Sequence, residues 1–161
     1  MTDYSDLLFT MAAILIFSLF LLQANQAMVR NDVVTVDNEY EKTAISVAQS
    51  VIDEARNKVF DQTLLDGEAP STLPDGFRLE LGPTEGLTRS DFEVFDHYHG
   101  YSETVETQLG DYVVDVNVSY VSDTAPFTEV TGPTFRKKME VRVRQADANG
   151  RAQLNYIKTY F

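Results

Sequence analysis

The chain has 161 residues, with 13 Lys and Arg against 25 Asp and Glu, which gives a formal net charge of −12. This length corresponds to one domain with at most one appended segment. Because binding to nucleic acid depends on Lys and Arg that neutralise phosphates, the charge argues against DNA or RNA as a partner. The chain has no cysteine, which excludes disulfides, thiolate nucleophiles, cysteine zinc sites and iron–sulfur clusters.

The N-terminal part of the chain contains an apolar run of membrane-spanning length. No residue from Leu7 to Val29 is charged, and only Thr10 and Ser18 interrupt the apolar stretch 7–22. A helix needs roughly 20 such residues to cross a hydrocarbon core of about 30 Å. We therefore predict a hydrophobic helix over residues 1–30. Its core positions are Leu7, Leu8, Phe9, Met11, Ile14, Leu15, Phe17, Leu19, Phe20 and Leu22.

A cleavable signal peptide is the alternative interpretation of this run. Such a peptide begins with Lys or Arg and ends in small residues at the cleavage site. Here the flank carries Asp3 and Asp6 without a base, and the run ends in the polar segment 23–26. The flanks therefore favour a hydrophobic helix that is retained.

The residues that follow predict an amphipathic helix over about 38–62. All Gly and Pro lie at or after Gly67, so the first 66 residues lack both of the strongest helix breakers. The β-branched segment 31–37 permits, without requiring, a kink or an unwound turn, and Asn38 with Glu41 could cap a restarted helix. Apolar residues then recur at the spacing of one helical face, which indicates packing on a sheet or a partner: Ile45, Ala48, Val51, Ile52, Ala55 and Val59.

Beyond Gly67 the pattern changes to turns and strands. Residues 63–111 form an acidic, turn-rich loop region in which we expect short strands near 77–81 and 92–95. Residues 112–161 alternate between apolar and polar side chains and predict an antiparallel meander with strands at 112–120, 135–144 and 152–161. The Asn-Gly pair in 147–150 suits a hairpin turn. The predicted fold class is α+β, with a long N-terminal helix packed on a C-terminal antiparallel sheet in a head of residues 31–161.

Charge is divided unevenly along this head. Residues 32–129 carry 21 acids and 5 bases, whereas residues 130–161 carry 7 bases and 2 acids. Opposite charges on two surfaces of a subunit can fix how copies of it dock. The alternative is that these bases pair with acids of their own domain, where exposed ion pairs contribute little. The candidate patch for contacts between subunits comprises Arg136, Lys137, Lys138, Arg142 and Arg144.

No set of residues indicates catalysis. His97 and His99 could offer two nitrogens to a metal, but a site needs a third protein ligand, and a surface aromatic loop explains them better. The sequence contains no nucleophile elbow, P-loop or dinucleotide fingerprint. We therefore expect a protein that is not an enzyme and that carries no metal and no cofactor.

The order of these elements resembles the type IV pilin and pseudopilin family. The resemblance covers the whole chain in architecture: hydrophobic helix, amphipathic continuation, variable loops and antiparallel sheet. It implies removal of a basic leader by a prepilin peptidase, methylation of the new N-terminus, and stacking of the hydrophobic helices into a filament core. If Met1 is that N-terminus, Ser5 stands where the family usually carries Glu, and the nearest acids are Asp3 and Asp6.

An acid at the start of the hydrophobic helix has a physical role in such a filament. A buried N-terminal amine needs a partner, and a carboxylate of a neighbouring subunit would supply it. We favour Asp6 over Asp3 as the partner of the Met1 amine because Asp6 directly adjoins the apolar run. Two solvated acids at a membrane surface are the alternative. The first base of the chain is Arg30, after the run, so a removed basic leader would account for the missing bases before it.

The resulting expectation is a structural subunit of an extracellular type IV pilus-like filament. It would lie in the inner membrane before assembly and at the cell surface afterwards. Its partners would be further copies of itself, the membrane, the prepilin peptidase and the pilus assembly machinery. The alternatives are a single-pass anchored subunit of a larger envelope complex or a component of a secretion-system pseudopilus. A membrane-tethered enzyme comes last, because no acid, base and nucleophile are brought together by the sequence.

Overall fold

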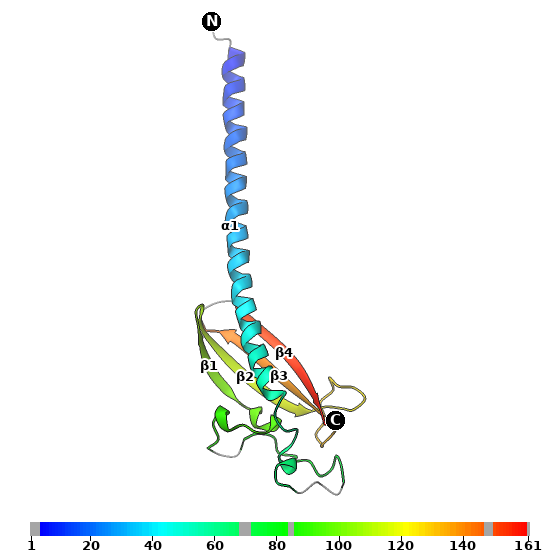
Figure 1. Cartoon of the computed structure of the whole chain (residues 1–161). Coiled ribbons are helices and arrows are strands. Elements are labelled where there is room, and N and C mark those ends of the chain that lie inside the picture. The colour runs from blue at the N-terminus through cyan, green and yellow to red at the C-terminus, as the bar shows by residue number, and fades with distance from the viewer. Residues whose placement is uncertain (1–3, 68–71, 84–85, 147–149, 161) are drawn as a thin grey trace. The chain divides into compact units, whose positions relative to one another are not determined.

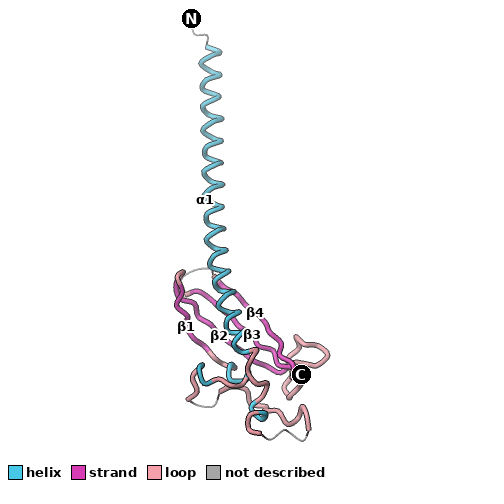
Figure 2. Tube along the Cα trace, in the orientation of Figure 1, coloured by secondary structure: helices cyan, strands magenta, loops and turns pink. Residues whose placement is uncertain are grey.

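The structure is a computed structural model that describes residues 4–67, 72–83, 86–146 and 150–160. The chain divides into two compact units, residues 1–39 and residues 40–161. The long helix is α1 (Tyr4–Ala55), and the strands are β1 (Ser102–Thr107), β2 (Gly110–Tyr120), β3 (Arg136–Gln145) and β4 (Arg151–Thr159). Three short 3-10 helices lie between α1 and β1 (Figures 1 and 2): η1 (Gln62–Leu64), η2 (Arg89–Asp91) and η3 (Phe95–Tyr98).

Residues 31–37, where the sequence permits an unwound turn, are α-helical. The Thr35 hydroxyl donates to the carbonyl oxygen of Asn31 over 2.8 Å, so this polar side chain is satisfied within the helix. Ordinary residues differ in helix propensity by only up to about 0.7 kcal/mol each, which is too little to unwind a turn flanked by helix on both sides. The restart at Asn38 is therefore not needed, and α1 includes it.

From Tyr40 onward, α1 crosses one face of the sheet (Figure 1). The predicted apolar face is confirmed at its centre, since Ala48, Val51 and Ala55 are buried. Ala44, which was not among the predicted apolar positions, is also buried. Small alanine side chains let the helix backbone approach the valine-rich sheet closely. The sheet contributes Val114, Val116, Val118, Val141 and Val143 to this core.

The helix ends at Ala55, earlier than the predicted end near residue 62. The backbone of Val59 pairs instead with the segment around Val94, donating to the carbonyl oxygen of Glu93 over 3.0 Å and accepting from Phe95 over 2.8 Å. This parallel bridge gives the backbone of Val59 partners that a helix would otherwise supply. The apolar residue Val59, which fits the helical spacing, therefore lies in an extended segment and not in a last turn of the helix.

The four strands form an antiparallel meander in the order β1-β2-β3-β4. The three predicted strands correspond to β2, β3 and β4, and the alternation along β2 is confirmed, with Tyr112, Val114, Val116, Val118 and Tyr120 buried. Arg144 pairs with Arg151 at the end of the β3–β4 ladder. The hairpin turn expected there falls on residues 147–149, outside the described residues. Helix and sheet together make the α+β fold that the sequence predicts.

Two expectations for the loop region are wrong. Residues 77–81 form no strand, and the stretch 92–95 contributes only the bridge at Val94. The first strand of the sheet is instead β1, which pairs with β2 from Ser102 to Thr107. Its outward residues are polar and its one aliphatic residue is Val105, so its composition gives a weak strand signal. Residues 63–111 are thus loops and 3-10 helices that end in an edge strand.

Candidate functional site

The apolar side chains of residues 7–22 are exposed around the whole circumference of α1. Leu8, Leu15 and Phe20 are 66%, 64% and 67% exposed, respectively. A helix that is apolar on every side is stable in an apolar environment, either lipid or other helices. By length and composition, the helix could cross a membrane.

The two hydroxyl side chains in this run are satisfied locally. Thr10 donates to the carbonyl oxygen of Leu7 and Ser18 to that of Ile14, each over 2.8 Å. In an apolar environment an unpaired hydroxyl would be costly, so these bonds suit both residues to burial among lipids or helices.

Asp6 lies in the first turn of α1 and is exposed. A carboxylate there is favoured by the partial positive charge of the helix N-terminus, by typically 0.3 to about 1 kcal/mol at a surface. Met1 and Asp3, the other two residues assigned to the amine contact, lie outside the described residues. Of the three residues assigned to the amine contact, only Asp6 therefore lies within the described residues.

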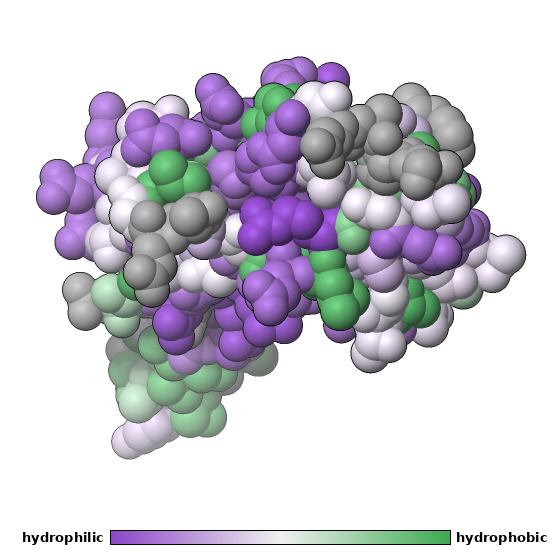
Figure 3. Space-filling model, turned by 90° about the horizontal axis from the view of Figure 1, so that it is seen from below, coloured by the Kyte–Doolittle hydropathy of each residue, from purple (hydrophilic) through white to green (hydrophobic). Residues whose placement is uncertain are grey.

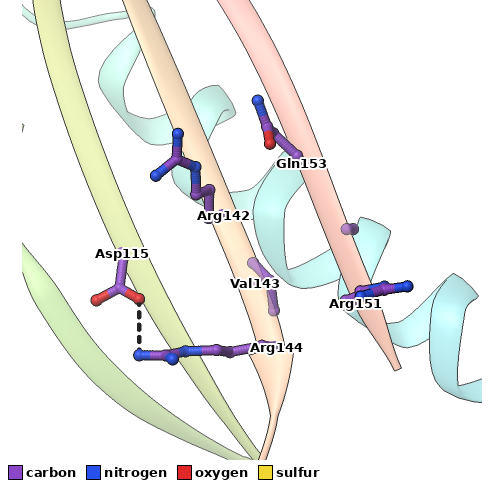
Figure 4. Close-up of a pocket in the computed structure, with 7 residues that line it drawn as sticks. Asp115, Arg142, Val143, Arg144, Arg151 and Gln153 are labelled. Carbon is purple, nitrogen blue, oxygen red and sulfur yellow. Dashed lines mark ion pairs between the residues drawn. The ribbon is translucent and has the colours of Figure 1, made fainter. Parts of the chain in front are cut away.

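The head carries a basic surface on the face of the sheet that α1 does not cover. Its residues are Arg142 and Arg144 of β3 with Arg151 and Gln153 of β4, beside Asp115 of β2, and they line a shallow pocket (Figure 4). We call this set the outer arginine surface. Elsewhere, the visible face of the head is also largely hydrophilic (Figure 3).

Arg142 and Arg144 have carboxylate partners within the chain. Arg144 lies 3.3 Å from Asp115, and Arg142 forms an ion pair with Glu140. Both arginine side chains nevertheless remain more than 60% exposed, at 66% and 69%. Exposed pairs of this kind are weak, so the guanidinium groups stay accessible to a partner.

Arg151 was missing from the sequence-based set, although the ladder brings it opposite Arg144. The other two bases of that set contribute less to the exposed surface. Arg136 is half-buried, and the Lys138 ammonium lies 2.6 Å from Glu129 with a side chain only 11% exposed.

Lys137 does not belong to a surface patch, which corrects the sequence-based assignment. Its side chain is fully buried. It occupies the same face of β3 as Met139, Val141 and Val143, two residues apart along the strand, and this face packs against the core. Side chains alternate between the two faces of a strand, so this alternation predicts that Lys137 points into the core.

The buried ammonium of Lys137 lies between two buried carboxylates. Its Nζ is 2.7 Å from Oδ2 of Asp61 and 2.6 and 2.7 Å from the two carboxyl oxygens of Asp96. It also donates to the backbone carbonyl of Phe60 over 3.0 Å. Asp61 follows the bridge at Val59, Asp96 lies in η3, and Lys137 lies in β3, so the cluster joins three separate segments of the head. We call these three side chains the buried Lys–Asp cluster.

The two carboxyl groups of the cluster have opposite pKa shifts. Burial raises the pKa of Asp96 to about 6, and the attraction of Lys137 does not compensate. Burial also acts to raise the pKa of Asp61, but the charge of Lys137 and hydrogen bonds from Lys137 and Thr63 outweigh it, so the pKa is lowered. Asp96 therefore takes up a proton more readily than Asp61.

Aromatic rings enclose the cluster. The Nζ of Lys137 lies 4.5 Å from the ring centre of Phe60 and 4.8 Å from that of Tyr120, and Phe77 lies 6.0 Å away. The single proton of the Tyr120 hydroxyl is shared between the carbonyl oxygen of Arg78, at 2.7 Å, and Oδ2 of Asp61, at 3.1 Å. Rings at these distances stabilise the cation and exclude water.

The two histidines do not form a surface loop, contrary to expectation. His97 is buried in η3 and its Nε2 lies 3.1 Å from Oε1 of Gln62, whereas Nδ1 of His99 lies 2.7 Å from the carbonyl oxygen of Val118. Burial lowers the pKa of His97, which favours its neutral form. Among the described residues, no group of three or more His, Asp or Glu side chains is arranged to hold a metal ion.

No protein-family model matches the chain, and no curated protein or solved structure matches it.

Proposed function

We propose that the chain is a structural, non-enzymatic subunit of a type IV pilus-like filament and that it polymerises through its hydrophobic N-terminal helix. The observation that carries the proposal is the exposure of apolar side chains on every side of α1 over residues 7–22. In the membrane, lipid covers these side chains before assembly. In the filament, the helices of neighbouring subunits take the place of the lipid.

The head supports this proposal through its polar surface. A subunit that leaves the membrane for an aqueous filament needs a hydrated exterior, and the 23 acids and 12 bases of residues 31–161 supply one. In an open filament, one surface of each subunit meets a different surface of the next. The outer arginine surface and the acidic remainder of the head are of opposite sign, which suits such a contact.

A single-pass anchored subunit of an envelope complex is the second candidate, because the same helix could simply cross the membrane. A pseudopilus component of a secretion system shares the assembly mode of the first proposal and differs in the length and location of the filament. The anchored subunit would keep its helix in lipid permanently, whereas the filament subunit would leave the membrane.

The test is to shear surface filaments from cells that make the protein and to measure the mass of its N-terminal peptide. The proposal predicts that this chain is found in the sheared filaments and that Met1 follows a cleaved leader and carries one added methyl group. Recovery only in the membrane fraction, with an intact or formylated initiator methionine, would favour the anchored subunit instead.

A further inference from the structure

The buried Lys–Asp cluster carries an inference that is independent of filament assembly. It combines a primary amine, one carboxyl group in contact through both oxygens, and a second carboxylate in contact with the same amine. These are the reactants and the base of an amide condensation. We infer that Lys137 and Asp96 form an intramolecular isopeptide bond, with Asp61 as the catalytic residue that transfers protons.

The contact holds the amine within reach of the Asp96 carboxyl carbon. The Nζ of Lys137 lies at nearly equal distances, 2.6 and 2.7 Å, from the two oxygens. Nζ therefore lies in the plane of the carboxyl group, roughly 3 Å from its carbon, and a rotation of the Asp96 carboxyl group turns its face toward the amine for attack. Because folding holds both groups in place, the reaction does not pay the entropy of an encounter between free molecules.

The two aspartates suit different roles. An amine attacks a neutral carboxylic acid far more readily than a carboxylate, and Asp96 is the carboxyl group whose pKa burial raises, to about 6. Burial acts to raise the pKa of Asp61, but the Lys137 charge and hydrogen bonds from Lys137 and Thr63 lower it. Asp61 is therefore the carboxyl group of the pair that is ionised beside the ammonium and can accept a proton. Pairs of carboxyl groups whose environments separate their pKa values are typical of acid and base roles.

The reaction balances without any added reagent. The Lys137 ammonium gives one proton to the Asp96 carboxylate, which leaves a neutral amine and a neutral acid. Nζ attacks the carboxyl carbon and passes a second proton to Asp61. The protonated Asp61 then donates this proton to the departing hydroxyl, which leaves as water. One C–N bond forms, one C–O bond breaks, and Asp61 is regenerated as a carboxylate.

The surroundings of the cluster favour the product. Phe60, Phe77 and Tyr120 enclose the ammonium, so little water is present to hydrolyse the amide. Condensation also removes the Lys137–Asp96 ion pair from the interior, and the Asp61 carboxylate that remains keeps hydrogen bonds from Thr63 and Tyr120. Oδ1 of Asp61 accepts from the backbone N–H and the hydroxyl of Thr63, at 3.1 and 2.9 Å, and these bonds hold the base in position.

The bond would close a covalent loop between residues 41 positions apart. This loop contains β1 and β2 and attaches η3 to β3. A crosslink of this span restricts the unfolded chain as a disulfide does, in a protein that has no cysteine.

The test is peptide mapping of the full-length, detergent-solubilised protein after denaturation, with a protease specific for glutamate. Cleavage after glutamate releases residues 94–103, which contain Asp96, and residues 130–140, which contain Lys137. The inference predicts a branched peptide that joins the two and whose mass is lower than their sum by one water. If wild-type protein yields these peptides only as separate, unmodified species, the inference is wrong.

Loss of water elsewhere in the chain does not imitate this result. Asp-Gly sequences can lose water as succinimides, and they occur at 66–67 and 75–76, which fall in other peptides of the digest. Lys138 gives an internal control, because its ammonium is also 2.6 Å from a carboxylate but that partner, Glu129, is 54% exposed. Fragmentation of the branched peptide should assign the linkage to Lys137 and not to Lys138.

Variants separate the reactants from the base. Lys137→Arg keeps the positive charge but removes the amine, so the branched peptide should be absent. Asp61→Asn keeps both reactants and removes the base, which should slow linkage on the order of a hundredfold or more. Lys138→Arg should leave the yield unchanged. Full linkage in Asp61→Asn at the wild-type rate would exclude the role of Asp61.

Discussion

Arg89 binds Glu54 through two donors, with Nε at 3.0 Å and Nη2 at 2.8 Å from the same carboxylate oxygen. The other oxygen of Glu54 accepts from the Tyr98 hydroxyl over 2.6 Å, and Arg89 also forms an ion pair with Glu103. These contacts connect the end of α1, the segments η2 and η3, and strand β1. The loop region between Ala55 and β1 is thereby tied to the helix by polar contacts in addition to its apolar ones.

This network predicts a pH dependence of stability. Burial opposes ionisation of Glu54, but hydrogen bonds from Tyr98 and Arg89 outweigh it and lower its pKa below the ordinary 4.5. The contribution of ionised Glu54 to the free energy of unfolding is therefore fully present above pH 4.5. It is lost as the pH falls through the lowered pKa of Glu54 in the folded protein. Glu54→Gln should reduce the free energy of unfolding at pH 7 by about 1 to 2 kcal/mol and flatten its decline in acid.

Urea unfolding of the detergent-solubilised protein between pH 3 and 7, followed through the signal of its buried tyrosines, measures this effect. Asp53→Asn is the matched control, because the Asp53 pair with Arg56 is exposed on both sides, at 67% and 57%. It should change stability by less than about 0.5 kcal/mol. Equal effects of the two substitutions would contradict the role of the Glu54 network.

The contact between α1 and the sheet predicts a strong size limit at Ala48, which is fully buried. Ala48→Leu should lower the free energy of unfolding by about 1 to 3 kcal/mol, because the larger side chain forces the helix away from the sheet. Gln49→Leu, at the next and exposed position, should be nearly neutral. Urea unfolding measures both, and a neutral Ala48→Leu would show that the helix does not pack closely there.

The helix and the sheet could be predicted from the sequence because the helical period of α1 and the two-residue period of β2 are both strong. Apolar residues recur at helical spacing around Ala48 and alternate along β2 around Val116, and both patterns match the buried faces. Edge strand β1 was not predicted, because all its residues except Val105 are polar and it shows no apolar–polar alternation. An edge strand packs on one neighbour only, so its sequence needs few apolar residues.

Of the buried Lys–Asp cluster, the burial of Lys137 could be predicted from the sequence, but the identity of its carboxylate partners could not. The phase of β3 places Lys137 on the core face, and a buried lysine requires a carboxylate partner. Which carboxylates supply it depends on how residues 76 and 41 positions away fold back onto β3. No local pattern carries that information, because Asp61 and Asp96 lie in segments without a regular period.

The apolar helix gives the most direct prediction for assembly. Leu15→Asp places a charge in the middle of the apolar run, where it costs roughly 2.5 to 3.5 kcal/mol in a membrane-spanning helix and is at least as unfavourable in a packed helical core. Filaments should be absent, while the head should retain its native fold. Leu15→Phe, which remains apolar, should still assemble.

Electron microscopy of sheared material counts the filaments of both Leu15 variants, and circular dichroism of the purified protein reports on the fold. Wild-type numbers of filaments in Leu15→Asp would exclude assembly through this helix.

The acid in the first turn of α1 is predicted to pair with the N-terminal amine of a neighbouring subunit. Asp6→Lys should reduce filament yield at least tenfold, because like charges then meet in an apolar core. Asp6→Glu should retain most of the yield, and Asp3→Asn should have a smaller effect than Asp6→Asn. Normal assembly of Asp6→Lys, scored by the same filament count, would rule out the amine contact.

The outer arginine surface is predicted to contribute to docking between heads and little to folding. The double variant Arg142→Glu and Arg144→Glu should change the free energy of unfolding by less than about 1 kcal/mol, since both side chains are exposed. Its filaments should be fewer and should depend less on added salt. Arg56→Glu, which reverses a base outside this surface, is the control. If both variants assemble like wild type, the surface does not contact another subunit.

Crosslinking of the helices to one another tests the central claim most directly. The chain has no cysteine, so introduced cysteines are the only thiols. Pairs of cysteines, one within residues 7–14 and one within 15–22, should form disulfides between staggered helices of neighbouring subunits. Because each subunit would contact others through two different positions, oxidised filaments should yield a ladder of multimers on a denaturing gel. If no pair yields species larger than a dimer, the helices do not form a continuous core, and the filament proposal is contradicted.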